Sequence, residues 1–397
     1  MRNLLMRERF HLPEGVLYLD GNSLGPLPRG VPSRVSTRIS GEWGELLIRG
    51  WNEAGLMTEP DRVGARIGRL IGAWEDSVTV GDTLSIRLFQ ALDAALGARP
   101  ERRIVLSDTG NFPSDLYVAE ALLARLGRGH ELVRVAPDAV AGALDDRVAV
   151  LMLTHVDYRS GRLHDMAALT RAAHAHGIAV VWDLAHSVGA LEVDLAACEA
   201  DFAVGCTYKY LNGGPGAPAF LVASPEWHER VEPILAGWLG HAEPFAFESG
   251  YRPAEGVARF RVGTPPVLAM AALDAALELW DDVDMGEVRA ASIALSTRFV
   301  EEVEARCPGL ALAGPRDPRE RGSQVSFAFE HGYAAMQALI RRHGVIGDFR
   351  APDLMRFAFT PLYLSMEDVL VAAERLERVI GEREWDEPAF RQQAAVT

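Results

Sequence analysis

Two uninterrupted runs of apolar residues, 148–153 and 178–182, constrain the fold of this chain most strongly. An alternating strand keeps one face in water, whereas a continuous apolar strand is covered on both faces, as in a parallel sheet. Other strand and helix patterns alternate with these runs from about residue 76 to about residue 225. The alternation predicts an α/β fold with a doubly wound, mostly parallel central sheet flanked by helices. Ligands bind at the carboxyl ends of such strands, where this chain places Thr154 and Asp183.

The composition favours a globular protein that acts on a small-molecule substrate. The chain has 397 residues, of which 49% are hydrophobic, enough to fill a sizeable core. Its formal net charge of -15 argues against nucleic acid or an anionic membrane as a partner. No run of about 18 apolar residues occurs, and the first residues are too charged for a signal peptide. We therefore expect a cytoplasmic protein.

The sequence indicates neither a disulfide framework nor a metal site. Cys198, Cys206 and Cys307 are odd in number and lack Cys-x-x-Cys spacing, so small buried side chains are the better interpretation. His174 and His176 are two positions apart and cannot share a helix face, which disfavours a metal-binding pair. We expect no bound metal.

Changes in sequence texture divide the chain into three parts. We expect an N-terminal segment, residues 1–50, that packs on both domains, a large domain, residues 51–285, and a smaller α+β C-terminal domain, residues 286–397. Helices are predicted near residues 35–47, 267–280, 336–343 and 366–380. The tail after Glu384 is expected to be frayed.

Asp183 and Lys209 form the pair on which the functional interpretation depends. Lys209 stands between two tyrosines before a glycine-rich turn, and Asp183 ends the second apolar run. Pyridoxal phosphate requires an amine that holds its aldehyde as a Schiff base and a carboxylate that keeps its pyridine nitrogen protonated. At roughly 4 Å and an effective dielectric near 20, that carboxylate contributes about 4 kcal/mol, enough for protonation at neutral pH. His186 and Tyr208 are placed to approach the same cofactor.

Four other stretches suit a flat, phosphorylated ligand, although each also has a plain structural interpretation. Leu84 and Ser85 open a helix whose N–H groups suit phosphate binding. Phe112 follows a strand and suits stacking on a ring, and Trp51 lies in a loop bracketed by glycines. Asn22 lies in a turn rich in small polar residues. Taken singly, each stretch is also explained by core packing, an ordinary helix start or a surface turn.

Together the motifs resemble those of the kynureninase family, fold-type-I pyridoxal phosphate enzymes related to the class V aminotransferases. The matching motifs are Gly-Asn-Ser-Leu-Gly from Gly21, Asn-Phe-Pro-Ser-Asp from Asn111, Asp-Leu-Ala-His-Ser-Val-Gly from Asp183, Tyr-Lys-Tyr-Leu-Asn from Tyr208, Gly-Trp-Leu-Gly-His from Gly237, Phe-Arg-Val-Gly-Thr-Pro-Pro from Phe260 and Pro-Leu-Tyr ending at Tyr363. They follow the family order and span residues 21–363. Among related enzymes, Tyr-Lys-Tyr-Leu-Asn is specific to this family.

The resemblance implies a role for most of these positions. Lys209 would form the Schiff base, Asp183 would pair with the pyridinium nitrogen, and Tyr208 would donate protons. The other implied cofactor contacts are Leu84, Ser85, Phe112, Asp115, Thr154, His186, and Trp238 and Thr264 from a partner subunit. Arg356 would bind the substrate carboxylate, because a guanidinium forms two parallel hydrogen bonds with it. Asn22, Trp51 and His241 would shape the aryl pocket. The resemblance therefore also implies a homodimer whose site is completed across the interface.

The implied reaction is hydrolysis of L-kynurenine, or of 3-hydroxy-L-kynurenine, to L-alanine and anthranilate or 3-hydroxyanthranilate, as in tryptophan catabolism. The chain departs from the family pattern at Ser85, where threonine is common, and at Arg87, where asparagine or a similar residue is common. Trp51 matches the bacterial form of the pattern. These departures bear on substrate preference more than on reaction type, so a secondary-metabolite substrate stays open.

Two other interpretations remain open at this level. One is a cysteine desulfurase-like or aminotransferase-like enzyme of the same fold. Desulfurases commonly place histidine before the lysine and need a mobile cysteine, whereas Tyr208 precedes Lys209 and Cys307 lies in no family motif. The other is a cofactor-fold protein kept as a binding module, which the presence of both Asp183 and Lys209 disfavours.

Overall fold

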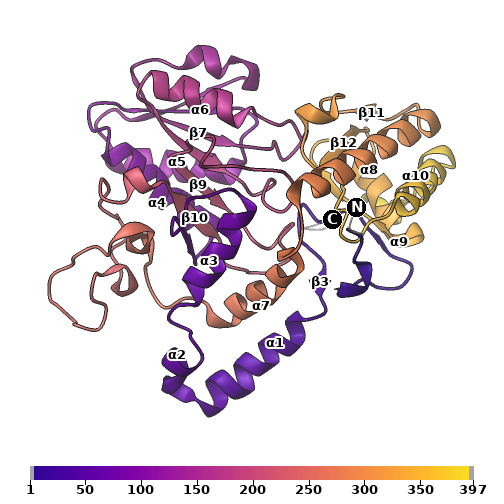
Figure 1. Ribbon diagram of the computed structural model, residues 1–397. Coiled ribbons are helices and arrows are strands. Elements are labelled where there is room, and N and C mark those ends of the chain that lie inside the picture. Colours follow the sequence, from indigo (N-terminus) through magenta and orange to yellow (C-terminus); the bar gives the residue numbers. More distant parts are fainter. Residues whose placement is uncertain (1–3, 393–397) are drawn as a thin grey trace.

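Two separate sheets organise the computed structural model, which describes residues 4–392 (Figure 1). The strands of the larger sheet, in spatial order, are β4 (Val78–Val80), β10 (Phe220–Ala223), β9 (Phe202–Gly205), β8 (Ala179–Asp183), β7 (Val148–Thr154), β5 (Ile104–Asp108) and β6 (Glu131–Val135). The strands of the smaller sheet are β11 (Ala311–Leu312), β12 (Gln324–Ala328), β15 (Leu354–Ala358) and β14 (Asp348–Arg350).

The larger sheet is mostly parallel, as the apolar runs predict. The pairs β5–β6, β5–β7, β7–β8 and β8–β9 are parallel, and only β10 runs antiparallel to its neighbours β9 and β4. All residues of β7 and β8 are buried. The expected α/β fold with a mostly parallel central sheet is therefore confirmed.

Helices cover both faces of this sheet. On one face lie α4 (Leu84–Gly97) and α5 (Pro113–Leu126), and on the other lie α3 (Glu59–Leu70), α6 (Met166–Ala175) and α7 (Val267–Leu277). Successive side chains of a strand point to opposite faces. In β7, accordingly, Val150 and Met152 pack in the cluster with α4 and α5, whereas Leu151 and Leu153 pack in the cluster with α3, α6 and α7.

The smaller sheet is antiparallel and packs with the long helix that begins at Met285. Phe299 of that helix contacts the rings of Phe327, Phe357 and Phe359. The helices of this region are α8 (Met285–Arg306), α9 (Gly332–His343), α10 (Met366–Gly381) and α11 (Pro388–Arg391). In Figure 1 this orange and yellow part lies beside the larger sheet and its helices.

The N-terminal segment contacts both parts of the molecule. Its strand β2 (Leu17–Tyr18) pairs in parallel with β13 (Val345–Ile346), and its helix α1 (Val31–Thr37) packs against α7. Strands β1 (Phe10–His11) and β3 (Leu27–Pro28) form a separate short pair.

The helix predicted over residues 35–47 is only partly correct. Helix α1 ends at Thr37, and residues 38–45 form wider π-helical turns. Two causes are visible: the buried Arg38 is held by Glu59 of α3, and Gly41 and Gly44 weaken α-helix formation. Tertiary contact thus overrides the local pattern.

Two further predictions were wrong in detail. Trp51 lies in a short helix, α2 (Gly50–Glu53), rather than in a loop. The chain beyond Glu384 is ordered at least to α11, because Trp385 and Phe390 are buried and α11 packs on α9. The last part of the predicted frayed tail, residues 393–397, lies outside the described residues. Within residues 4–392, no helix is long and apolar enough to cross a membrane.

Candidate active site

Asp183 and Thr154 stand side by side at the carboxyl edge of the larger sheet. They are register partners at the ends of β8 and β7, and both side chains are buried. The chain leaves β9 at Gly205 and reaches Lys209 four residues later. The Lys209 ammonium lies close enough to lower the pKa of Asp183, against a larger upward effect of burial. The structure therefore brings the predicted pair together.

Lys209 has a further property that the sequence analysis above overlooked. It is the only lysine in the chain, since the other 39 of the 40 basic residues are arginines. A chain that meets every other need for a cation with arginine retains one primary side-chain amine, and it lies beside Asp183. An amine that can lose its proton and attack a carbonyl is the chemistry that lysine offers and arginine does not. A count of lysines alone would have pointed to this residue.

Asp115 is the second carboxyl of the cluster. It lies in the first turn of α5, is 2% exposed, and is hydrogen bonded to Asp183. Burial raises the pKa of Asp115 well above its usual value, and the neighbouring Asp183 raises it further. Two buried carboxyls in contact share a proton or attract a cation. Thr154 donates to Asn111 and approaches Asp115 at 3.5 Å, so it joins the same network.

Several buried polar atoms around Lys209 have no partner within the described residues. They are His186 Nδ1, Tyr210 OH and Asn212 Oδ1. Burial lowers the pKa of His186 well below its usual value, with the Lys209 charge adding to the effect, so the ring is neutral. Buried polar atoms are normally hydrogen bonded. Unpaired atoms beside a buried carboxyl pair and a lysine fit a polar aromatic cofactor.

Two helix N-termini converge near this cluster. Ser85 in the first turn of α4 and Ser114 in the first turn of α5 approach each other, with their Oγ atoms 3.3 Å apart. Thr83, the residue before α4, makes no capping hydrogen bond with its side chain. The N–H groups of a helix start bind phosphate well. The predicted phosphate residues Leu84 and Ser85 thus lie on an uncapped helix start.

The donor set as a whole fits pyridoxal phosphate. Lys209 would hold the aldehyde carbon, Asp183 would face the pyridine nitrogen, and the start of α4 would hold the phosphate. Phe112 is 39% exposed and precedes α5, with Tyr158 edge-on to it at 5.1 Å between ring centres, so one ring face is available for stacking.

Arg356 of β15 lies in a network of its own. Its Nε donates to Asp348 Oδ1 at 2.8 Å, and its Nη2 donates to Ser23 Oγ at 3.0 Å and to Asp348 Oδ2. Its Nη1 donates to the Tyr158 carbonyl. Arg350 also binds Asp348, at 2.8 Å. The edge of the Arg356 guanidinium formed by Nε and Nη2 is therefore occupied by a carboxylate. Ser23 takes the second hydrogen of Nη2, and Nη1 keeps one hydrogen beside the one that it donates to the Tyr158 carbonyl.

The predicted residue Asn22 lies beside Arg356. With its amide turned, its oxygen accepts from Arg356 Nε at 2.9 Å and its nitrogen donates to Asp20 at 3.2 Å. The next turn residues reach the lysine loop, where Gly25 N donates to the Tyr208 carbonyl at 2.8 Å. A Cβ at Gly25 would lie 2.2 Å from the Lys209 carbonyl oxygen, so only glycine fits there.

The sequence analysis missed four residues of this network: Asp20, Asp348, Arg350 and Gln324. The Gln324 side-chain oxygen lies 3.1 Å from the Asn22 amide, and Gln324 is hydrogen bonded to His186, so it lies between the two halves of the cluster. A detectable signal existed only for Asp348 and Arg350. They alternate on one strand, and alternate strand residues share a face.

Within residues 4–392, the remaining predicted residues take no part in the hydrogen-bond network described above. Trp51 lies in α2, at the outer end of the arm formed by α1 and α2 in Figure 1, away from the strand ends. Trp238 is 39% exposed, Thr264 is exposed, and His241 binds within its own loop at the Gly250 carbonyl.

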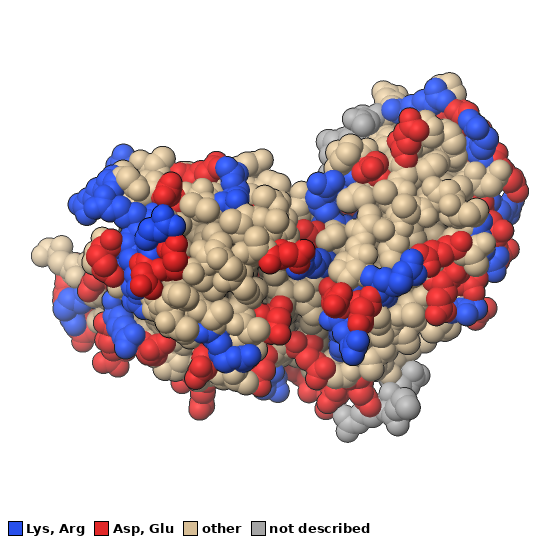
Figure 2. All heavy atoms as spheres, turned by 90° about the horizontal axis from the view of Figure 1, so that it is seen from above, with Lys and Arg blue, Asp and Glu red and all other residues tan. Residues whose placement is uncertain are grey.

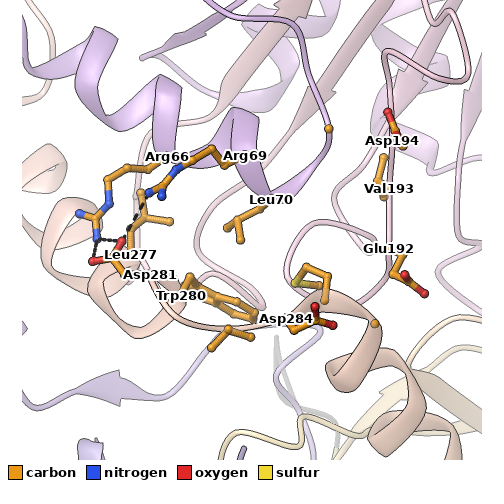
Figure 3. A pocket seen from close by; sticks show the side chains of 14 residues that line it. Arg66, Arg69, Leu70, Glu192, Val193, Asp194, Leu277, Trp280, Asp281 and Asp284 are labelled. Atoms are coloured by element: carbon orange, nitrogen blue, oxygen red, sulfur yellow. Dashed lines mark hydrogen bonds and ion pairs between the residues drawn. The ribbon is translucent and has the colours of Figure 1, made fainter. Parts of the chain in front are cut away.

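The hollow drawn in Figure 3 is a different place. It measures about 580 Å³ and is lined by α3, residues 192–194 and the segment from Leu277 to the start of α8. The Arg66–Asp281 ion pair and Trp280 form part of its wall, and none of the predicted site residues lines it. Within residues 4–392, no cluster of three or more His, Cys, Asp or Glu side chains could hold a metal ion.

The outer surface carries mixed charges. Figure 2 shows two lobes with a hollow between them, and on this face basic and acidic side chains are interspersed rather than segregated. This distribution, with the net charge of -15, gives no basic face for a polyanion on the side shown.

Comparisons with known proteins give a consistent result. Residues 288–376 match the family model described as the kynureninase C-terminal domain. The chain is 49% identical over 400 residues to a kynureninase of Burkholderia mallei (strain SAVP1) and 47% identical over 399 residues to one of Pseudomonas fluorescens, each match covering 99% of this chain and 96% of the relative.

Solved structures with the same fold include two cysteine desulfurases. The apo enzyme of Thermococcus onnurineus NA1 superimposes with a TM-score of 0.77 at 19% identity, and CsdA of Escherichia coli with a TM-score of 0.79 at 20% identity. Each match covers 95% of this chain and 98% of the other. At this identity the likeness concerns the fold alone.

Proposed function

The chain belongs to the kynureninase family, and on that premise we propose that it hydrolyses L-kynurenine to anthranilate and L-alanine with pyridoxal phosphate bound to Lys209. The observation that carries the proposal is the position of Lys209, the sole lysine, four residues beyond the end of β9 and near enough to the buried Asp183 of β8 for its charge to act on that carboxyl. Neither residue alone specifies a reaction, but an amine and a carboxylate so placed match what this cofactor requires.

When bound, the cofactor supplies a conjugated ring that accepts the electrons released as bonds at the substrate α- and β-carbons break. Asp183 holds the proton on the pyridine nitrogen, and Asp115 holds Asp183 in place through their hydrogen bond. Lys209, once its amine is free, takes the proton from the substrate α-carbon.

Tyr208 is the proton donor of the proposal. Burial raises the pKa of its phenol, and the neighbouring Cys206 thiol raises it further, so the side chain keeps its proton at neutral pH. Its ring centre lies 5.8 Å from Lys209 Nζ. A protonated phenol at this place can donate to the carbon that leaves with alanine.

Arg356 binds the substrate carboxylate with its positive charge and with the hydrogen of Nη1 that the Tyr158 carbonyl does not take. Asp348 holds the edge formed by Nε and Nη2, which fixes the plane of the guanidinium. Arg350 neutralises Asp348, so the pair of arginines keeps a net positive charge toward the substrate. Asn22 supports the same geometry from the N-terminal turn.

The proposal includes a homodimer. Trp238 and Thr264 are exposed in their own chain, and the same loop region exposes Phe245 (63%) and Phe247 (82%). Exposed aromatic residues in one loop suit a subunit interface. Trp51, at the outer end of its arm, would reach the aryl pocket of the partner in the same way.

The cytoplasm is the proposed location, and tryptophan catabolism the proposed setting. The three cysteines are free, as is usual in a reducing compartment. The domain limits proposed from the sequence, 51–285 and 286–397, place the two sheets in different domains.

Desulfurase activity is the rival that the fold allows, and the cysteines argue against it. Cys206 and Cys307 are buried, and Cys198 is half-buried. Burial raises the pKa of Cys307 to about 11, so its thiolate is scarce at neutral pH. A desulfurase needs an accessible thiolate as nucleophile.

The test is a comparison of substrates with purified holoenzyme. We expect kcat/KM for L-kynurenine or 3-hydroxy-L-kynurenine, measured by release of the anthranilate, to exceed by orders of magnitude that for alanine release from L-cysteine. The reverse order would overturn the proposal. The ratio between the two kynurenines assigns the preferred substrate.

A further inference from the structure

Arg87 is a fully buried arginine that the proposed reaction does not use. It lies one turn inside α4, and its side chain is 1% exposed. Its ion-pair partner is Asp82, whose side chain is 38% exposed. The distance from Arg87 Nη2 to Asp82 Oδ2 is 3.6 Å. Burial lowers the pKa of Arg87 to about 10, so the guanidinium stays charged at neutral pH. A buried charge of this kind is costly unless its donors are well used.

The donors of Arg87 join two distant segments. Nε donates to the Gly81 carbonyl at 3.0 Å, and Nη1 donates to the Phe260 carbonyl at 2.8 Å. Nη1 also donates to Gln90 Oε1 at 2.9 Å, and Gln90 Nε2 donates to the same Phe260 carbonyl at 2.9 Å. Arg87 and Gln90 thus form a two-residue clamp on Phe260.

On one side, Arg87 binds the loop that precedes the start of α4, the proposed phosphate site. Gly81 N donates to the Ala219 carbonyl, and Ala219 N donates to the Asp82 carbonyl, so the loop is also tied to the sheet. Gly81 has a φ of +155°, and a Cβ there would lie 2.8 Å from Arg87 Nη2. A glycine is required at this position for the guanidinium to reach its place.

On the other side, Arg87 and Gln90 bind Phe260, which lies in the segment that bears Trp238 and Thr264. Phe260 lies four residues before Thr264, and Leu239 N donates to the Val262 carbonyl at 3.3 Å. A Cβ at Gly237 would lie 2.0 Å from that same carbonyl oxygen. The loop around Trp238 and the strip from Phe260 to Thr264 are therefore packed together, and Arg87 holds their inner end.

We propose that Arg87 is a positioning residue that locks the start of α4, the proposed phosphate site, to the segment bearing Trp238 and Thr264, and so sets the geometry of that helix start. The inference rests on the proposed cofactor site. In this role Arg87 would act through the Gly81 and Phe260 carbonyls rather than by binding the phosphate. Because misplacement of a binding group by a fraction of a hydrogen-bond length weakens the bond steeply, loss of the clamp should be felt at the phosphate.

The experiment measures the affinity of the apoprotein for two ligands. Pyridoxal phosphate and pyridoxal, which lacks the phosphate, are each titrated against wild type, Arg87→Met, Arg87→Lys and Arg102→Met, with the visible absorbance of the bound ligand as readout. Arg102 is the matched control, because its Nη1 also donates to two backbone carbonyls, of Val148 and His176, at the amino end of β7.

We expect Arg87→Met to weaken the binding of pyridoxal phosphate by about tenfold or more, where tenfold corresponds to about 1.4 kcal/mol. The affinity for pyridoxal should change by no more than about twofold. Arg87→Lys should fall between, since a lysine can reach one carbonyl but cannot span both. Arg102→Met should leave the ratio of the two affinities unchanged. The ³¹P resonance of the bound cofactor should shift in Arg87→Met only.

If Arg87→Met leaves the ratio of the two affinities unchanged, the inference is overturned. Equal weakening of the binding of both ligands would show a merely structural role. If Arg87→Met does not fold, Gln90→Leu removes half of the clamp, and an unchanged ratio there overturns it equally. Wild-type protein that fails to bind pyridoxal phosphate would instead defeat the proposed function, and this inference with it.

Discussion

At the scale of single residues, the chemistry depends on how a few buried charges are paired. Asp183 is the clearest case, because it is hydrogen bonded to Asp115 and Thr154 at the end of an apolar strand and is under the influence of the Lys209 charge. The position of Asp183 at a strand end, and the chemistry that an acid and a lysine offer, could be predicted from the sequence, because both are local properties. Asp20 and Gln324 could not be predicted, because their importance comes only from contacts with residues far away in the chain.

Replacing Asp183 should separate cofactor binding from catalysis. In Asp183→Asn the cofactor should still bind to Lys209, but kcat for kynurenine should fall by about three orders of magnitude, because about 4 kcal/mol of stabilisation of the protonated ring is lost. The rate of anthranilate release, divided by the amount of bound cofactor, measures this loss. Asp201→Asn is the control, a buried carboxylate that binds Trp227 and Val180 instead; a similar loss there would contradict the assignment.

Asp20 gives the site a pH dependence. Burial, then the neighbouring Asp348, raises the pKa of Asp20 to about 7, while Ser23, Arg356 and Arg350 oppose the shift. Below that pH Asp20 is neutral and leaves the positive charge of the arginines uncompensated. Affinity for a substrate carboxylate should therefore be greatest below about pH 7 and decline as the pH rises through it.

The measurement is the Kd of a non-cleaved carboxylate analogue of kynurenine as a function of pH. Asp20→Asn should remove the decline, whereas Asp93→Asn, which removes a half-buried carboxyl of α4 whose pKa burial also raises, should retain it. A decline that persists in Asp20→Asn would assign the titration to another group.

At the scale of elements, periodicity and apolar runs predicted most strands and the later helices, but not the places where tertiary contacts decide. The start of the residue 35–47 helix was found, whereas its π-helical continuation follows from the buried Arg38–Glu59 pair. The chain after Glu384 looked polar and unsupported, yet Trp385 and Phe390 anchor it. The direction of β10, antiparallel to its neighbours, also had no local signal.

Helix α10 should owe part of its stability to a capping box. Ser365 Oγ accepts from Asp368 N at 3.2 Å, and Asp368 Oδ2 accepts from Ser365 N at 2.8 Å. Ser365→Ala should lower the free energy of unfolding by about 1 kcal/mol without changing kcat. Ser40→Ala, which removes an exposed hydroxyl bonded to the Ser36 carbonyl, is the control for thermal unfolding. Equal melting temperatures for the two variants would refute the cap.

At the scale of the whole molecule, the account requires two copies of the chain. The sequence offered a resemblance that implied this but no direct signal, because an interface is a property of surfaces rather than of periodic patterns. The structure adds the exposure of Trp238 and Thr264, and the position of α2, which carries Trp51, at the outer end of its arm.

Mixed subunits provide the test. A Lys209→Ala subunit and a subunit carrying Trp238→Ala and Thr264→Ala should each be nearly inactive alone. In a mixed dimer, one site receives an intact Lys209 from one subunit and intact loops from the other. After subunit exchange at equal amounts, about a quarter of the wild-type activity should return. No recovery, with exchange verified by mass, would refute the shared site.

Reductive trapping tests whether Lys209 carries the cofactor with which kynurenine is cleaved. Since the chain has no other lysine, borohydride treatment of the holoenzyme should add one cofactor to the Lys209 peptide, as seen by mass spectrometry. Prior incubation with L-kynurenine should reduce this labelling, because the substrate displaces Lys209 from the cofactor. Labelling that is absent from the Lys209 peptide, or that kynurenine does not change, would contradict the account.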